Sequence, residues 1–77
     1  MPSNTDKKNI VRSTTELGAL IRRVRKEQGL TQAQVAGFCN VGLRFFSELE
    51  NGKPTARLEL VLKVIKILGL DLALEKR

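Results

Sequence analysis

Hydrophobic residues between positions 13 and 29 recur with the spacing of an α-helix and predict the first helix of the chain. The apolar positions are separated by three, four and seven residues, which places them on one face. They are Leu17, Leu20, Ile21 and Val24. Ser13 and Glu16 precede this face in the pattern of a capping box, and Gly29 supplies a left-handed stop.

Two shorter helical patterns follow, in the stretches TQAQVAGFC and LRFFSELEN. Thr31 and Gln34 form a second capping-box pattern at the start of the first stretch. The turn between the stretches contains Asn40, which tolerates a left-handed backbone, and Gly42, which is an acceptable N-cap. Helices this short are marginal alone because nucleation is costly, so the flanking helices must hold them in place.

A fourth helix is predicted from about Ala56 to Leu68, with Thr55 as its cap and Gly69 as its stop. Only Glu59, Lys63 and Lys66 interrupt the apolar positions from Leu58 to Leu68. This is a wider apolar surface than a helix on the outside of a small domain needs. Because the three preceding helices can cover only one side, a second copy of the chain is the natural cover for the other.

The last eight residues, LDLALEKR, alternate leucine with other residues and predict a β-strand. In an otherwise helical chain this strand pairs with the same strand of a second copy, pairs with Ile10–Val11, or frays. We therefore expect a homodimer held by the fourth helix and this strand. The expected dimer contacts are Leu60, Val64, Ile67, Leu70, Leu72 and Leu74.

The length of 77 residues indicates one domain, which we place at residues 12–69. It lies between a flexible tail, residues 1–11, and the C-terminal dimerisation strand, residues 70–77. The net charge of +6 indicates an acidic partner, and nucleic acid is the commonest one. The alternative is that the charge has no such meaning, since many small soluble proteins are basic.

Several chemistries are excluded by composition. With no histidine and a single cysteine, Cys39, the sequence offers neither a zinc cluster nor a disulfide framework, and Cys39 is expected to pack in the core. It also lacks a phosphate-cradling glycine loop, so we expect no metal, no cofactor and no enzymatic activity. No apolar run has the length of a signal-peptide core or of a membrane span, which favours a cytoplasmic protein without membrane contact.

Two short helices joined by a tight turn and held by neighbours form a helix-turn-helix, whose second helix can enter a DNA major groove. The stretch LTQAQVAGFCNVGLRFFSELENGK resembles the Cro/repressor-type helix-turn-helix, the XRE family. The resemblance rests on LTQ before the second helix, Ala36, Val41, the apolar Phe46, and LENGK after the third helix. It implies an all-α, lambda-repressor-like domain of four helices, here with a C-terminal β-strand.

The segment from Gly42 to Leu74 is similar to HipB-like antitoxins, which dimerise through a C-terminal strand and neutralise a HipA-like kinase toxin. Lambda-repressor relatives have a fifth helix where this chain has a strand pattern. The similarity implies a bacterial, nucleoid-associated repressor that binds a palindromic double-stranded operator, autoregulates its operon and partners a HipA-like kinase.

The resemblance also assigns roles to single positions. Base edges are expected to face Gly42, Leu43, Arg44 and Glu48, and Phe45 points to the same side by helical spacing. Contacts to the DNA backbone are expected from Gln32, Ser47, Asn51 and Lys53.

Side-chain chemistry supports these roles unevenly. Arg44 can bond guanine O6 and N7 in bidentate fashion, or it is only a solvated surface arginine. Glu48 could accept a hydrogen bond from cytosine N4, or it is a salt-bridge partner. Glu50 is expected to anchor the backbone or an arginine of the first helix. Phe38 and Phe45 either tuck against a neighbouring helix or mark an exposed contact surface.

Two other functions remain open from the sequence. One is a free-standing helix-turn-helix regulator with no toxin. The other is a protein-only toxin neutraliser that has lost DNA binding. Gly42 and Leu43 keep it open, because neither residue has a side chain that can donate a hydrogen bond to a base. A kinase-like reading frame beside this gene would favour the antitoxin.

Overall fold

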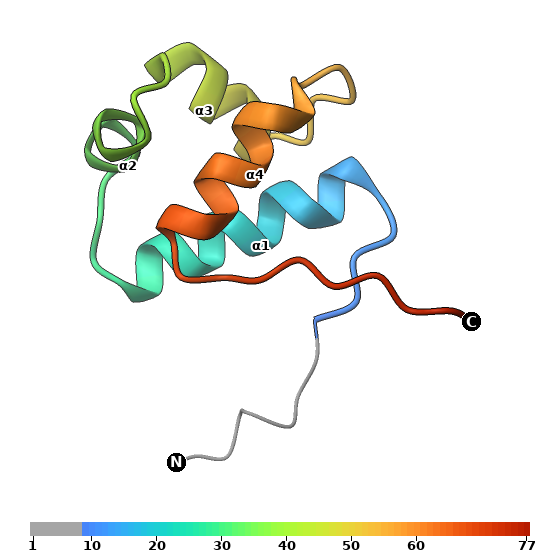
Figure 1. Cartoon of the computed structure of the whole chain (residues 1–77). Helices are drawn as coiled ribbons and strands as arrows, with labels where there is room; N and C mark the ends of the chain where they lie inside the picture. Colours follow the sequence, from blue (N-terminus) through green and yellow to red (C-terminus); the bar gives the residue numbers. More distant parts are fainter. Residues whose placement is uncertain (1–8) are drawn as a thin grey trace.

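A computed structural model describes residues 9–77, which form four α-helices and no strand. The helices are α1 (Thr14–Glu27), α2 (Gln32–Cys39), α3 (Leu43–Glu50) and α4 (Leu58–Ile67). α3 contacts both α1 and α2, and α2 also contacts α4. Figure 1 shows α4 crossing over α1, with α2 and α3 gathered beyond one side of this crossing. The expected all-α fold of four helices is confirmed.

Side-chain hydrogen bonds cap the N-termini of α1 and α2. Thr31 and Gln34 form the complete predicted capping box, with Gln34 N donating to Thr31 Oγ1 at 3.1 Å and Thr31 N donating to Gln34 Oε1 at 2.8 Å. At α1 only half of the predicted box forms. Ser13 Oγ accepts from Glu16 N at 3.0 Å, but the Glu16 carboxylate accepts from the backbone N–H of Arg12 at 2.6 Å instead of Ser13.

The predicted start of α4 is wrong. The helix begins at Leu58 with Arg57 as its N-cap, and Thr55 lies in a turn that precedes it. The first helical acceptor is the carbonyl of Arg57, which receives the N–H groups of Leu60 and Val61. Thr55 is therefore too far from the first turn for its hydroxyl to cap it, and no side chain caps this helix.

All four helices end in the way that the sequence predicts, through a residue with positive φ. These residues are Gly29 (72°), Asn40 (55°), Gly52 (83°) and Gly69 (81°). After each helix, the N–H of the next residue donates to a carbonyl oxygen of the final turn, as in a Schellman motif. Because the chain leaves each helix in a fixed direction, Leu30 and Leu70 fold back onto the core.

The core is formed by one apolar face of each helix. Its fully buried members include Ile21 from α1, Cys39 from α2, Phe46 from α3 and Val64 from α4. The predicted core position of Cys39 is confirmed, and burial raises the pKa of its thiol. Among the described residues, no helix is both long and apolar enough to cross a membrane.

The wide apolar surface of α4 is divided between the chain's own core and solvent. Val61, Val64 and Ile65 are buried, whereas Leu62 and Ile67 are exposed. The prediction of Val64 as a dimer contact is wrong, because its side chain is 0% exposed in a single chain and has no surface left for a second copy. Leu60 is half-buried and keeps part of its surface open.

The predicted C-terminal strand is absent from the single chain. Leu70 N–H donates to Ile65 O and so belongs to the cap of α4, and the residues that follow it run on in an extended path without a strand. A strand needs the N–H and C=O groups of a neighbouring strand, and residues 9–77 contain no strand. Leu72 and Leu74 are consequently exposed. Ile10–Val11 does not pair with this segment, and residues 1–8 of the predicted tail lie outside the described part of the chain.

Gly18 fixes the distance between α1 and α3. A Cβ atom at Gly18 would lie 2.4 Å from the carbonyl oxygen of Leu49 and 2.5 Å from that of Glu50. α1 therefore approaches the C-terminal end of α3 backbone to backbone, which only glycine permits. This contact sets the position of α3, the second helix of the helix-turn-helix.

Gly18→Ala is expected to destabilise the fold by about 3 kcal/mol, because main-chain atoms must move apart to admit the methyl group. The matched control is Gly37→Ala. Gly37 is exposed inside α2 with nothing within 4 Å of an added Cβ, so its replacement should stabilise by about 0.5–1 kcal/mol. Urea unfolding followed by circular dichroism measures both changes. Equal effects of the two substitutions would show that α1 and α3 do not meet at Gly18.

Candidate nucleic-acid interface

A buried ion pair joins α1 to α3. Arg25 donates from Nε to Glu50 Oε2 at 2.6 Å and from Nη2 to Glu50 Oε1 at 3.1 Å, while its Nη1 donates to the carbonyl oxygen of Leu30 at 2.8 Å. Both side chains are buried, and the hydrogen bonds to Glu50 raise the pKa of Arg25. The prediction that Glu50 anchors an arginine of the first helix is confirmed.

The same carboxylate also holds the first residue of α2. Gln32 Nε2 donates to Glu50 Oε1 at 2.9 Å, and the Gln32 side chain is half-buried. Glu50 thus connects three helices through one side chain. This link was not predicted from the sequence. The signal for it was a glutamate at an inward-facing position of α3, because a buried carboxylate needs several donors. A phosphate contact by Gln32 stays a prediction.

The N-terminal turn of α3 is the most open part of the helix-turn-helix. Gly42 and Leu43 are exposed, and the side chain of Arg44 is 90% exposed. The backbone N–H groups of this turn have no side-chain cap, because Gly42 is the N-cap. The Arg44 side chain is therefore accessible to a ligand beyond the surface.

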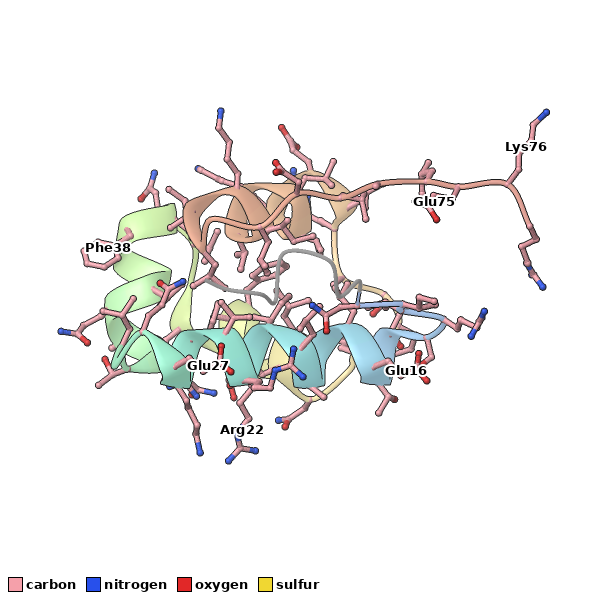
Figure 2. All side chains as sticks on the ribbon, turned by 90° about the horizontal axis from the view of Figure 1, so that it is seen from below. Glu16, Arg22, Glu27, Phe38, Glu75 and Lys76 are labelled. Carbon is pink, nitrogen blue, oxygen red and sulfur yellow. The ribbon has the colours of Figure 1, made fainter. Side chains whose placement is uncertain are left out.

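The two phenylalanines with open alternatives take different positions. Phe45 is half-buried and packs against the core, so only part of its ring remains available at the surface. Phe38 is 61% exposed, and Figure 2 shows it projecting from the outer side of α2, away from the rest of the chain. The alternative in which Phe38 tucks against a neighbouring helix is wrong.

Glu48 lies between the two cations of this surface. Its Oε1 accepts from Lys53 Nζ at 3.1 Å, and its Oε2 lies 3.4 Å from Arg44 Nε. The hydrogen bond from Lys53, followed by the nearby charges of Lys53 and Arg44, lowers the pKa of Glu48, so the carboxylate is charged at neutral pH. In the single chain Glu48 is a salt-bridge partner.

The predicted site residues form two groups. Arg44 and Lys53 each pair with Glu48, on α3 and the loop after it. Gln32 lies apart from them, at the start of α2, and is tied to Glu50. Asn51 is the exposed C-cap of α3, and Ser47 is half-buried. No metal-binding group of three or more His, Cys, Asp or Glu side chains occurs within residues 9–77.

This geometry defines a helix-turn-helix: two short helices meet at a left-handed turn, and the second presents an open, cationic first turn. The chain belongs to the helix-turn-helix domain family, whose model matches residues 16–77. It is similar to y4mF of Sinorhizobium fredii (strain NBRC 101917 / NGR234), described as an uncharacterized HTH-type transcriptional regulator. The two are 51% identical over 59 residues, which cover 77% of this chain and 78% of the relative.

Solved structures of HipB are similar to this chain over nearly its whole length. A structure titled "HipB-O4 20mer complex" is 25% identical with a TM-score of 0.82, covering 90% of this chain and 97% of that one. A structure titled "Structure of HipA-HipB-O2-O3 complex" is also 25% identical, with a TM-score of 0.83 and the same coverage. The resemblance to HipB-like members of the XRE family is confirmed, and the chain is an HTH-type transcriptional regulator.

Glu50→Gln is expected to destabilise the fold by about 3–5 kcal/mol, because it leaves the buried charge of Arg25 without a counter-charge. Arg25→Met should have a similar effect, because it leaves the buried carboxylate of Glu50 without a counter-charge. The double variant Arg25→Met/Glu50→Met should lose much less than the sum, since neither charge is then left alone. Urea unfolding of the three variants measures the coupling.

The control is Arg57→Met, which breaks an exposed pair with Glu59 at 3.3 Å. Exposed pairs contribute about 0–1 kcal/mol, so this variant should be nearly as stable as the parent chain. If Glu50→Gln cost no more than this control, the buried pair would not hold α1 to α3.

Proposed function

We propose that this chain is a sequence-specific DNA-binding repressor that acts as the antitoxin of a HipA-like kinase toxin and autoregulates its operon in the bacterial cytoplasm. The observation that carries the proposal is the open first turn of α3, where Arg44 extends from a helix that buried contacts hold rigidly. Similarity to HipB in a structure whose title names HipA supports the antitoxin role.

Base readout is proposed at the exposed turn of α3. Arg44 is the one cation between Leu43 and Glu50, and a guanidinium can bond guanine O6 and N7 together. The small exposed Gly42 lets the helix approach the groove closely, and Leu43 offers an apolar contact to a thymine methyl group. The proposed base contacts are Gly42, Leu43, Arg44, Phe45 and Glu48.

Backbone contacts are proposed on both sides of that turn. Lys53 supplies a charge for a phosphate, and the exposed amide of Asn51 supplies a neutral donor. Gln32 is positioned by Glu50 at the start of α2, where the helix dipole also favours an anion. The proposed backbone contacts are Gln32, Ser47, Asn51 and Lys53.

We further propose a homodimer in which a second copy covers the apolar side chains left open at α4 and the C-terminal segment. Ile67, Leu72 and Leu74 are exposed, and Leu60 and Leu70 are half-buried. Two-fold symmetry would place two copies of α3 on successive major grooves and would match a palindromic operator. A free-standing regulator would share this DNA site and dimer, and a kinase-like gene beside this one would distinguish the antitoxin from it.

The parent chain is expected to bind DNA from upstream of its own gene more tightly than a scrambled duplex of the same length. Arg44→Ala should remove about 1–3 kcal/mol of this discrimination per half-site, because the guanine contact is lost, while binding to scrambled DNA falls far less. Arg44→Lys should restore the charge but only part of the discrimination, since an ammonium lacks the bidentate fork. Fluorescence anisotropy at one fixed salt concentration measures both affinities. Equal losses on both duplexes would make Arg44 a phosphate contact.

Deleting residues 70–77 should weaken the homodimer, because the deletion removes Leu72 and Leu74 together with Leu70, which covers the end of the core. Leu72→Ser/Leu74→Ser is a milder variant that leaves the cap of α4 intact. Sedimentation at tens of micromolar should show a dimer for the parent chain and a shift toward monomer for both variants. A stable monomer of the parent chain would contradict the proposed dimer.

A further inference from the structure

The position of Lys53 beside Glu48 is fixed by the backbone. Lys53 N–H donates to the carbonyl oxygen of Glu48 at 3.0 Å, and Gly52 between the end of α3 and Lys53 has a φ of 83°. This turn carries the chain back over the last turn of α3, so the Lys53 ammonium lies within 3.1 Å of the Glu48 carboxylate. The pair is therefore a consequence of how α3 ends.

Arg44 meets the same carboxylate from the other end of α3. It precedes Glu48 by four residues, which places both side chains on one face of the helix, and the Arg44 Nε lies 3.4 Å from Glu48 Oε2. Each carboxylate oxygen thus faces one cation. Two positive charges and one negative charge leave a net charge of +1 on this cluster, which we call the Arg44–Glu48–Lys53 cluster.

A carboxylate in this position competes with DNA for both cations. A phosphate oxygen offers Arg44 or Lys53 the same charge-assisted hydrogen bond that Glu48 already supplies. When a DNA phosphate takes the place of the Glu48 carboxylate as the partner of Arg44 or Lys53, the binding free energy therefore gains little. The displaced carboxylate is also repelled by the negative charge of the DNA. A guanine edge differs, because it gives Arg44 two aligned acceptors, and a cytosine N4 can donate to the released Glu48.

We propose that Glu48 sets the sequence specificity of this protein by holding Arg44 and Lys53 in the free chain, so that DNA without the matching bases binds weakly. The proposal rests on the DNA-binding function proposed above and names a regulating group within the same site. Specificity then comes from the repulsion between Glu48 and the DNA phosphates as well as from the attraction between Arg44 and a guanine. The exposed ion pairs contribute only about 0–1 kcal/mol to folding, so removing the charge of Glu48 should change stability little.

The test compares Glu48→Gln with Glu59→Gln. Both substitutions remove one negative charge, and both break an exposed pair with an arginine, but Glu59 lies on α4 and pairs with Arg57. The pair of variants separates the change in net charge from the local role of Glu48. Affinity is measured by fluorescence anisotropy for the upstream DNA and for a scrambled duplex of equal length, over a series of salt concentrations.

Glu48→Gln is expected to tighten binding to the scrambled duplex more than Glu59→Gln does. The slope of log affinity against log salt concentration should steepen by about 0.9 for each additional phosphate that the protein neutralises, hence by up to about 1.8 for Arg44 and Lys53 together. The ratio of upstream to scrambled affinity should fall. Circular dichroism and the unfolding midpoint should stay close to those of the parent chain.

Two results would overturn the proposal. If Glu48→Gln lowered affinity for the upstream DNA and left the scrambled duplex unchanged, Glu48 would be only a base contact. If both variants changed both affinities equally, Glu48 would act only through net charge. Failure of the parent chain to prefer the upstream DNA over the scrambled duplex would instead overturn the proposed function, and the role of Glu48 with it.

Discussion

The hydrogen-bonded pair between Arg25 and Glu50 holds α1 and the helix-turn-helix together. It joins α1 to the last residue of α3. Arg25 Nη1 also donates to the carbonyl oxygen of Leu30, and Glu50 Oε1 also accepts from Gln32 Nε2. One carboxylate and one guanidinium therefore fix α1, the connection after it, the start of α2 and the end of α3. Because charges that lose their partner in the interior are costly, alternative packings of these helices are disfavoured.

This constraint explains how two eight-residue helices become a rigid unit. Neither α2 nor α3 is long enough to be stable in isolation. The close approach at Gly18 and the ion pair at Glu50 hold the C-terminal end of α3, and the core side chain of Phe46 holds its middle. What remains open is its first turn. A surface that must match base edges needs this arrangement, in which the presenting helix is fixed and only its outward side chains can adjust.

Local features of the fold were predictable from the sequence, and features that depend on distant residues were not. The stops at Gly29 and Asn40 and the capping box at Thr31 depend on neighbours a few residues away, and they are confirmed. Thr55 failed as a cap because any Ser or Thr near a helix resembles one, and the turn after Pro54 decides which residue starts the helix. The alternation from Leu70 onward failed as a strand because a strand must pair with another strand, and residues 9–77 of one copy form none.

The candidate site divides in the same way. The exposure of Arg44 and the ion pair of Glu50 with α1 follow from helical spacing, which separates outward from inward positions. Sequence patterns could not show that Val64 packs into the chain's own core, because apolar residues lie on more than one side of the fourth helix. Nor could they show that Gly18 lies against the end of α3, since this contact joins residues about thirty positions apart.

We propose that the open turn of α3, with the start of α2, is the surface that contacts DNA. NMR mapping of amide chemical shifts while the upstream duplex is added would locate this surface. We expect the shift changes to concentrate at residues 31–32 and 42–53, with little change at Phe38 and along the exposed side of α4. Shifts that gathered on α4 or the C-terminal segment, and left 42–53 unmoved, would contradict it.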